Sequence, residues 1–137
     1  MPETLRRVLW IDDDSPKEGH VVGGFEFRTA QTCAAALAIL LDNAFMPDAI
    51  IVDIVLPQGG WGDRFYETPG IELVKQVRDQ RPGIDLAVFS IAINEERTRR
   101  AHEAGADLVR SKNQLGLLQL LKELRQAKDT TTRKDAD

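Results

Sequence analysis

The chain has 137 residues, of which 42% are hydrophobic and 29% are charged, so it is long enough for one soluble domain with a single core. Its net charge of −4 argues against nucleic acid as the main partner, because phosphate binding normally requires a basic face. The single cysteine, Cys33, excludes an internal disulfide. Because no long uncharged segment indicates a signal peptide or a membrane span, we expect a cytoplasmic protein with no membrane partner.

Strand and helix signals alternate along the chain. Apolar runs without polar alternation predict strands that are buried on both faces, and capping residues with Gly or Pro nearby mark the ends of helices. The predicted strands cover residues 8–11, 25–28, 49–52, 86–89 and 107–110. The predicted helices are a short one between Asp14 and Gly23, one that begins at Thr29 or Thr32 and ends near Leu41, and then residues 70–80, 94–104 and 114–127.

This alternation predicts a doubly wound α/β fold. Five strands that alternate with five helices form a parallel sheet joined by right-handed crossovers, with helices on both faces. We expect a single domain over residues 1–127. Residues 128–137 are mostly polar and lack periodicity, which predicts a flexible C-terminal tail.

Acidic residues follow two of the predicted strands. Asp12, Asp13 and Asp14 come directly after the first strand, and Asp53 comes directly after the strand over 49–52. Groups just past the carboxyl ends of strands converge on one crevice in an open α/β sheet. Crowded carboxylates repel one another, so the pattern indicates a divalent cation with oxygen ligands, of which magnesium fits best. The alternative, acidic loops that only keep the surface soluble, explains one such cluster more easily than two.

Further motifs stand at the ends of the later strands. Pro57 follows Asp53 by four residues, Ser90 ends the fourth strand, Ala104-Gly105-Ala106 precedes the fifth strand, and Lys112 follows it. Each motif alone is weak, but together with Asp12-Asp13 they occur in order at the correct strand ends. In this respect the chain resembles the receiver domain of two-component response regulators over residues 8–124. The resemblance implies a five-stranded parallel sheet with the flavodoxin-like order 2-1-3-4-5.

The resemblance also implies a chemistry. Asp53 would accept a phosphoryl group from a histidine kinase or a histidine phosphotransfer protein, Lys112 would neutralise its oxygens, and Ser90 would donate a hydrogen bond to one of them. The implied Mg²⁺ ligands are Asp13, Asp53, the main-chain carbonyl of Val55 and, through water, Asp12. Such a chain is a phospho-accepting signalling domain that catalyses its own phosphotransfer and acts through contact with a separate effector protein. Members of the family also form homodimers.

The chain departs from the family in its loops. Relative to the family it has an insertion over residues 58–69, whose three aromatic side chains predict a lid over the acidic pocket, a docking surface or a loop packed on the neighbouring helix. The first helix is short for the family. Val109 stands where many members have a switching Tyr or Phe, and Asn113 stands where they have a proline.

Residues around the acceptor differ from the family as well. Ile91 replaces a small residue beside Ser90 and would crowd the phosphoryl group, while Val55 and Ala92 are apolar and orient water poorly, which predicts slow loss of the phosphoryl group. These departures leave a second function open, a pseudo-receiver that binds partners without being phosphorylated. A third, a magnesium-dependent phosphohydrolase, would need a second acid where Val55 stands.

Overall fold

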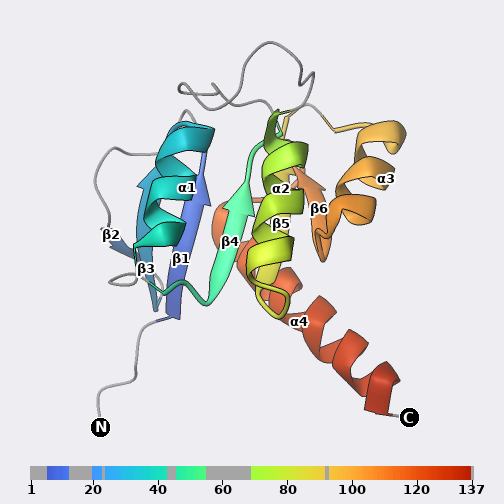
Figure 1. The fold of residues 1–137 in the computed structure, drawn as a ribbon. Helices are drawn as coiled ribbons and strands as arrows, with labels where there is room; N and C mark the ends of the chain where they lie inside the picture. The colour runs from blue at the N-terminus through green and yellow to red at the C-terminus, as the bar shows by residue number, and fades with distance from the viewer. Residues whose placement is uncertain are drawn as a thin grey trace, which may run out of the picture.

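The computed structural model describes residues 6–12, 20–22, 24–42, 46–54, 69–91 and 93–136, whose strands form one sheet in the order β2-β3-β1-β4-β5-β6 (Figure 1). The strands are β1 (Arg6–Ile11), β2 (His20–Val22), β3 (Phe25–Ala30), β4 (Ala49–Val52), β5 (Asp85–Ser90) and β6 (Leu108–Ser111). Among the described residues, the five strands other than β2 are parallel to one another and lie in the order β3-β1-β4-β5-β6. When these five strands are numbered one to five along the chain, this is the expected order 2-1-3-4-5. The predicted fold class is confirmed.

The edge strand β2 differs from the prediction. It pairs antiparallel with β3, so that Val21 lies opposite Glu26, and Gly24 in the turn between them has φ +85°, a backbone conformation that glycine adopts readily. A helix was expected as far as Gly23, and this is wrong for residues 20–22. Two consecutive valines favour extended backbone, because their branched Cβ atoms lose rotamer freedom in a helix. Residues 13–19, where that helix would begin, lie outside the described residues.

Four helices follow among the described residues: α1 (Cys33–Leu41), α2 (Pro69–Gln80), α3 (Glu95–Ala104) and α4 (Leu117–Ala136). Thr32 caps α1 by accepting a hydrogen bond from the N–H of Ala35, and Asn94 caps α3 in the same way from Arg97. Gly105 ends α3 with φ +125°. We expected α4 to end near Ala127, but it continues to Ala136, because no glycine or proline interrupts the chain there. Within the described residues, no helix combines the length and the apolar character needed to cross a membrane.

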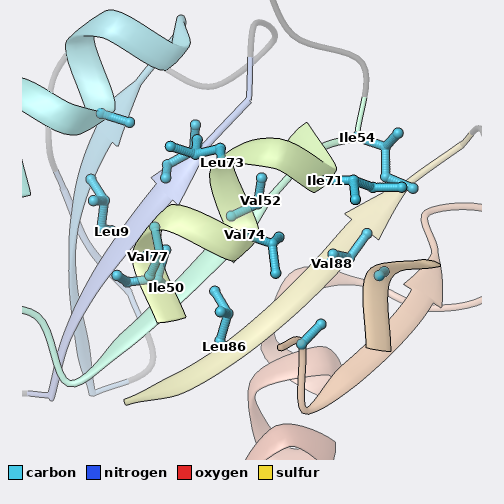
Figure 2. Packing of buried hydrophobic residues seen from close by; sticks show 14 of the residues in the cluster. Leu9, Ile50, Val52, Ile54, Ile71, Leu73, Val74, Val77, Leu86 and Val88 are labelled. Atoms are coloured by element: carbon cyan, nitrogen blue, oxygen red, sulfur yellow. The ribbon is translucent and has the colours of Figure 1, made fainter. Parts of the chain in front are cut away.

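Two hydrophobic layers enclose the sheet. Helices α1, α2 and α3 pack on one face and α4 on the other (Figure 1). Figure 2 shows the first layer, where Val74 and Val77 of α2 lie against strand residues such as Ile50. In β4, Ile50 and Val52 face this layer while Ile51 faces α4, and all of them are buried. Burial on both faces explains why the sequence of β4 is apolar without alternation.

The first layer also contains Cys33, the first residue of α1. Its thiol is buried, and this burial raises its pKa to about 11. The group therefore stays protonated at neutral pH and packs as a small apolar side chain.

Candidate functional site

Main-chain hydrogen bonds fix three of the predicted site residues at the carboxyl ends of neighbouring strands. The N–H of Asp12, directly after β1, donates to the carbonyl of Ala30 in β3 at 2.9 Å. The N–H of Asp53, directly after β4, donates to the carbonyl of Ile11 in β1 at 2.9 Å. The N–H of Lys112, directly after β6, donates to the carbonyl of Ser90 in β5 at 3.1 Å. Each residue is thus held in the sheet although it lies just beyond its own strand.

The side chains of these residues meet at the end of the sheet. The Ser90 hydroxyl donates to Oδ1 of Asp53 at 2.6 Å, and the Lys112 ammonium donates to Oδ2 of Asp53 at 3.0 Å. The same ammonium forms an ion pair with Asp12. The structure therefore brings Asp12, Asp53, Ser90 and Lys112 together from four different strands, because the carboxyl ends of parallel strands lie at one edge of the sheet.

The site is shielded from water. Asp12 is 1% exposed, Asp53 5% and Ser90 1%, while the side chain of Lys112 is 21% exposed. Buried charges require partners, since an isolated buried carboxylate is strongly disfavoured. Here the carboxylates of Asp12 and Asp53 both contact the ammonium of Lys112, in a place of low dielectric constant where charges interact strongly.

The ammonium of Lys112 responds to these neighbours. Burial alone lowers the pKa of Lys112, but hydrogen bonds to Asp12 and Asp53 and the charges of both acids outweigh burial and leave the pKa raised. Lys112 is therefore a permanent cation at neutral pH. It is placed to balance negative charge on Asp53 and on any anion that approaches this side chain.

The donor set fits a hard divalent cation. The carboxylates of Asp12 and Asp53 are oxygen ligands of the kind that Mg²⁺ prefers, and both lie close enough to contact one ammonium. Among the described residues, His, Cys, Asp and Glu form no cluster of three or more that could hold a metal ion. The other two expected ligands, Asp13 and Val55, lie outside the described residues.

The departures from the receiver pattern are partly visible. Ile91 is 62% exposed, and Val109 is buried in the layer that contains α3. After Lys112 the N–H of Gln114 donates to the carbonyl of Ser111 at 3.1 Å, so the turn that contains Asn113 is closed by a main-chain hydrogen bond. Ala92 and residues 55–68, which include most of the insertion, lie outside the described residues.

One residue at the site escaped the sequence analysis. Gly70 lies in the first turn of α2. Its N–H donates to the carbonyl of Ile54, the residue directly after Asp53, at 2.8 Å. The signal in the sequence was weak, because Gly70 begins the predicted helix over residues 70–80, and glycine is well tolerated at the start of a helix. The atoms that Gly70 contacts could not be predicted from the sequence.

Comparison with known proteins identifies the fold. No protein-family model matches the sequence, and no curated protein matches it. A response regulator receiver domain protein (CheY-like) from Methanospirillum hungatei JF-1 superposes with a TM-score of 0.69 at 24% identity, over 95% of this chain and 98% of that one. NtrX from Brucella abortus, in complex with ADP, gives 0.68 at 22% identity over 96% of this chain, which spans only 29% of NtrX.

A third structure is similar over most of its length. It is a response regulator protein from Burkholderia pseudomallei with a phosphorylated aspartic acid, a calcium ion and citrate, with a TM-score of 0.68 and 19% identity over 96% of this chain and 73% of that one. The fold of the chain is therefore that of a response regulator receiver (CheY-like) domain.

Proposed function

We propose that the chain is a cytoplasmic receiver domain that accepts a phosphoryl group on Asp53. The observation that supports this most directly is that Ser90 and Lys112 donate hydrogen bonds to the two carboxylate oxygens of Asp53. An acceptor that gains a negatively charged group requires donors already aimed at it. The fold supports the same function by analogy, because the response regulator protein from Burkholderia pseudomallei, which shares it, carries a phosphorylated aspartic acid.

In the proposed reaction an oxygen of Asp53 forms a bond to phosphorus. The donor is a phosphohistidine on a histidine kinase or a phosphotransfer protein; its P–N bond breaks, and the imidazole leaves with the electron pair. Lys112 balances the charge of the transferred group as a point charge, and Ser90 donates a hydrogen bond to it. Since both oxygens of Asp53 already accept hydrogen bonds, one donor must first withdraw. Lys112 is the more exposed of the two and has the longer, more flexible side chain, so we assign this movement to Lys112.

The proposed reaction requires Mg²⁺. The ligands would be Asp12 through water, Asp13, Asp53 and the main-chain carbonyl of Val55, of which the structure places Asp12 and Asp53 side by side on one ammonium. When bound, Mg²⁺ supplies positive charge that offsets the repulsion between a carboxylate and a phosphoryl group. The Burkholderia pseudomallei protein, with its phosphorylated aspartic acid and calcium ion, supports a divalent cation at a receiver fold.

The proposed signal leaves the domain by protein–protein contact. We assign the receiver domain to residues 1–127 and propose that it passes its signal to a separate effector protein. A second copy of the chain, bound in a homodimer, is a further proposed partner. Phosphorylation would act by changing the charge at the carboxyl end of the sheet, where four strands contribute side chains.

One observation favours the alternative of a pseudo-receiver. Asp53 is only 5% exposed, and both of its carboxylate oxygens accept hydrogen bonds from within the protein. A buried acid with a purely structural role has the same arrangement. Such a domain would bind its partner without a phosphoryl group. The two functions differ in whether Asp53 reacts.

Incubation with acetyl phosphate and Mg²⁺, followed by intact mass spectrometry, tests the proposal. We expect the wild type to gain the mass of one phosphoryl group and Asp53→Asn to gain none. Asp79→Asn, which changes an exposed acid on α2, is the matched control and should react like the wild type. Beryllofluoride should bind the wild type but not Asp53→Asn in ¹⁹F NMR. If the wild type neither gains mass nor binds beryllofluoride, the pseudo-receiver is the better assignment.

A further inference from the structure

The first turn of α2 lies unusually close to the main chain of Asp53. Helix α2 begins at the end of the sheet to which the β4 arrow points (Figure 1). A Cβ atom on Gly70 would lie 2.5 Å from the Cα of Ile54 and 2.8 Å from the carbonyl carbon of Asp53, and closer still to the carbonyl oxygen of Asp53. All three are main-chain atoms, which cannot rotate away as the end of a flexible side chain can. Only glycine permits this approach.

Helix propensity does not explain a glycine here. Gly70 is the second residue of α2 and its N–H donates to Ile54 outside the helix, so the preference of helix interiors for Ala over Gly applies only weakly. The missing side chain is explained by the peptide between Asp53 and Ile54, against which α2 is seated.

Asp53 is held from several directions at once. Its N–H donates to Ile11 of β1, and its carboxylate accepts hydrogen bonds from Ser90 and Lys112. On the carbonyl side, the hydrogen bond from the Gly70 N–H to Ile54 fastens the following residue to α2. Because the peptide unit is planar, a shift of the Asp53 carbonyl rotates the backbone that carries its side chain. The position of α2 therefore bears on the direction of the carboxylate.

We propose that Gly70 is a positioning residue for Asp53. By letting α2 seat against the Asp53–Ile54 peptide, it keeps the carboxylate aimed at the hydroxyl of Ser90 and the ammonium of Lys112. Gly70 touches no reacting atom and acts through the main chain. The consequence for phosphoryl transfer rests on the proposed function, whereas the consequence for the geometry of Asp53 does not.

The test compares three variants. Gly70→Ala introduces the close contact. Gly83→Ala adds the same methyl group at a glycine where a Cβ would meet nothing within 4 Å, so it controls for the change of residue type. Ile71→Ala removes a buried side chain from the same turn of α2 without adding an atom near Asp53, so it controls for loss of stability. Circular dichroism establishes that each variant is folded, with sucrose added where a variant is unstable.

The first readout is NMR of the free protein, which does not depend on phosphorylation. We expect Gly70→Ala to shift the Asp53 carboxyl carbon signal and to speed exchange of the Ser90 hydroxyl proton with water. Ile71→Ala and Gly83→Ala should leave both unchanged. Wild-type signals in folded Gly70→Ala would overturn the proposal. So would a Gly70→Ala chain that stays unfolded even in sucrose, because Gly70 would then support the whole fold rather than Asp53.

The second readout is the rate of phosphorylation by acetyl phosphate. A displacement of the reacting group by about 1 Å slows a reaction roughly 100-fold, and we expect a loss of this order in Gly70→Ala. Ile71→Ala should retain a rate within about twofold of the wild type while folded, since its reacting groups are not displaced. An unchanged rate in Gly70→Ala would contradict the positioning role. If the wild type does not react at all, the proposed function fails, but the NMR comparison still decides the role of Gly70.

Discussion

At the scale of single residues, Lys112 determines the charge balance of the site. Its ammonium contacts both buried carboxylates, those of Asp12 and Asp53. A buried charge that loses its partner is more costly than the pair was favourable, because the remaining charge stays desolvated. The same side chain that we assign to phosphoryl binding therefore also stabilises the fold.

Lys112→Met should for this reason destabilise the protein at neutral pH by about 3–5 kcal/mol, the usual penalty for breaking a buried pair. Urea unfolding measures this change. Lys122→Met, an exposed position on α4, is the control and should change the free energy of unfolding by less than about 0.5 kcal/mol.

The same variant should show a different response to alkaline pH. In the wild type the raised pKa of Lys112 means that its contribution is complete below about pH 10, the ordinary lysine range, and is lost as the pH rises through the raised value. Lys112→Met lacks this titrating group, so its deficit in the free energy of unfolding relative to the wild type should shrink as the pH rises above about 10. Urea unfolding at neutral and at alkaline pH measures this change. An equal deficit at neutral and at alkaline pH would show that Lys112 acts by packing alone.

At the scale of elements, Arg78 ties the end of α2 to its neighbours. Its guanidinium donates to the carbonyls of Pro82, Ile84 and Gly105 at 2.7–2.9 Å and to Oδ2 of Asp107 at 3.0 Å. The same oxygen of Asp107 accepts from the N–H of a β5 residue at 3.0 Å. One side chain thereby joins the end of α2, the start of β5 and the turn between α3 and β6.

Arg78→Met should lower the free energy of unfolding by about 2–4 kcal/mol, because three carbonyls and a partly buried carboxylate lose a charged donor at once. Thermal unfolding followed by circular dichroism measures this. Arg99→Met is the matched control: the ion pairs of Arg99 with Glu96 and Glu103 within α3 are exposed, and its loss should leave the midpoint unchanged. Equal effects of the two substitutions would contradict the assigned role of Arg78.

The elements also show how far the sequence could predict the structure. The parallel strands and the last three helices were recognisable, because long periodic or uniformly apolar runs reflect burial directly. Strand β2 was missed, since three residues such as His20–Val22 are too few for a helical and an extended period to be distinguished. The grouping of Asp12, Asp53, Ser90 and Lys112 followed from strand topology. The contact between Gly70 and Asp53 could not be predicted in this way, because it depends on how closely α2 packs against the main chain at the end of β4.

At the scale of the whole molecule, the helices differ in how firmly they are attached. Helix α2 buries Ile71, Leu73, Val74 and Val77 against the sheet. Among the residues of α3, all of which the structure describes, Ala101 alone is buried, and it contributes little apolar area. Both ends of α3 are capped, by Asn94 and Gly105, so the helix is well formed but weakly docked. Local opening of α3 should therefore require less free energy than local opening of α2.

Native-state hydrogen exchange should reveal this gradient. We expect the hydrogen-bonded amides of α3 to exchange at least about tenfold faster than those of α2, and those of β4, which lies between β1 and β5, to exchange most slowly. Ala101→Ser would place a hydroxyl at the buried contact of α3 and should speed exchange in α3 while leaving β4 near its wild-type rate. If α3 and α2 exchange at one common rate in both proteins, the two helices open together, and the weak docking of α3 does not allow it to open alone. A change of charge at Asp53 could then not reach a partner through movement of α3 alone.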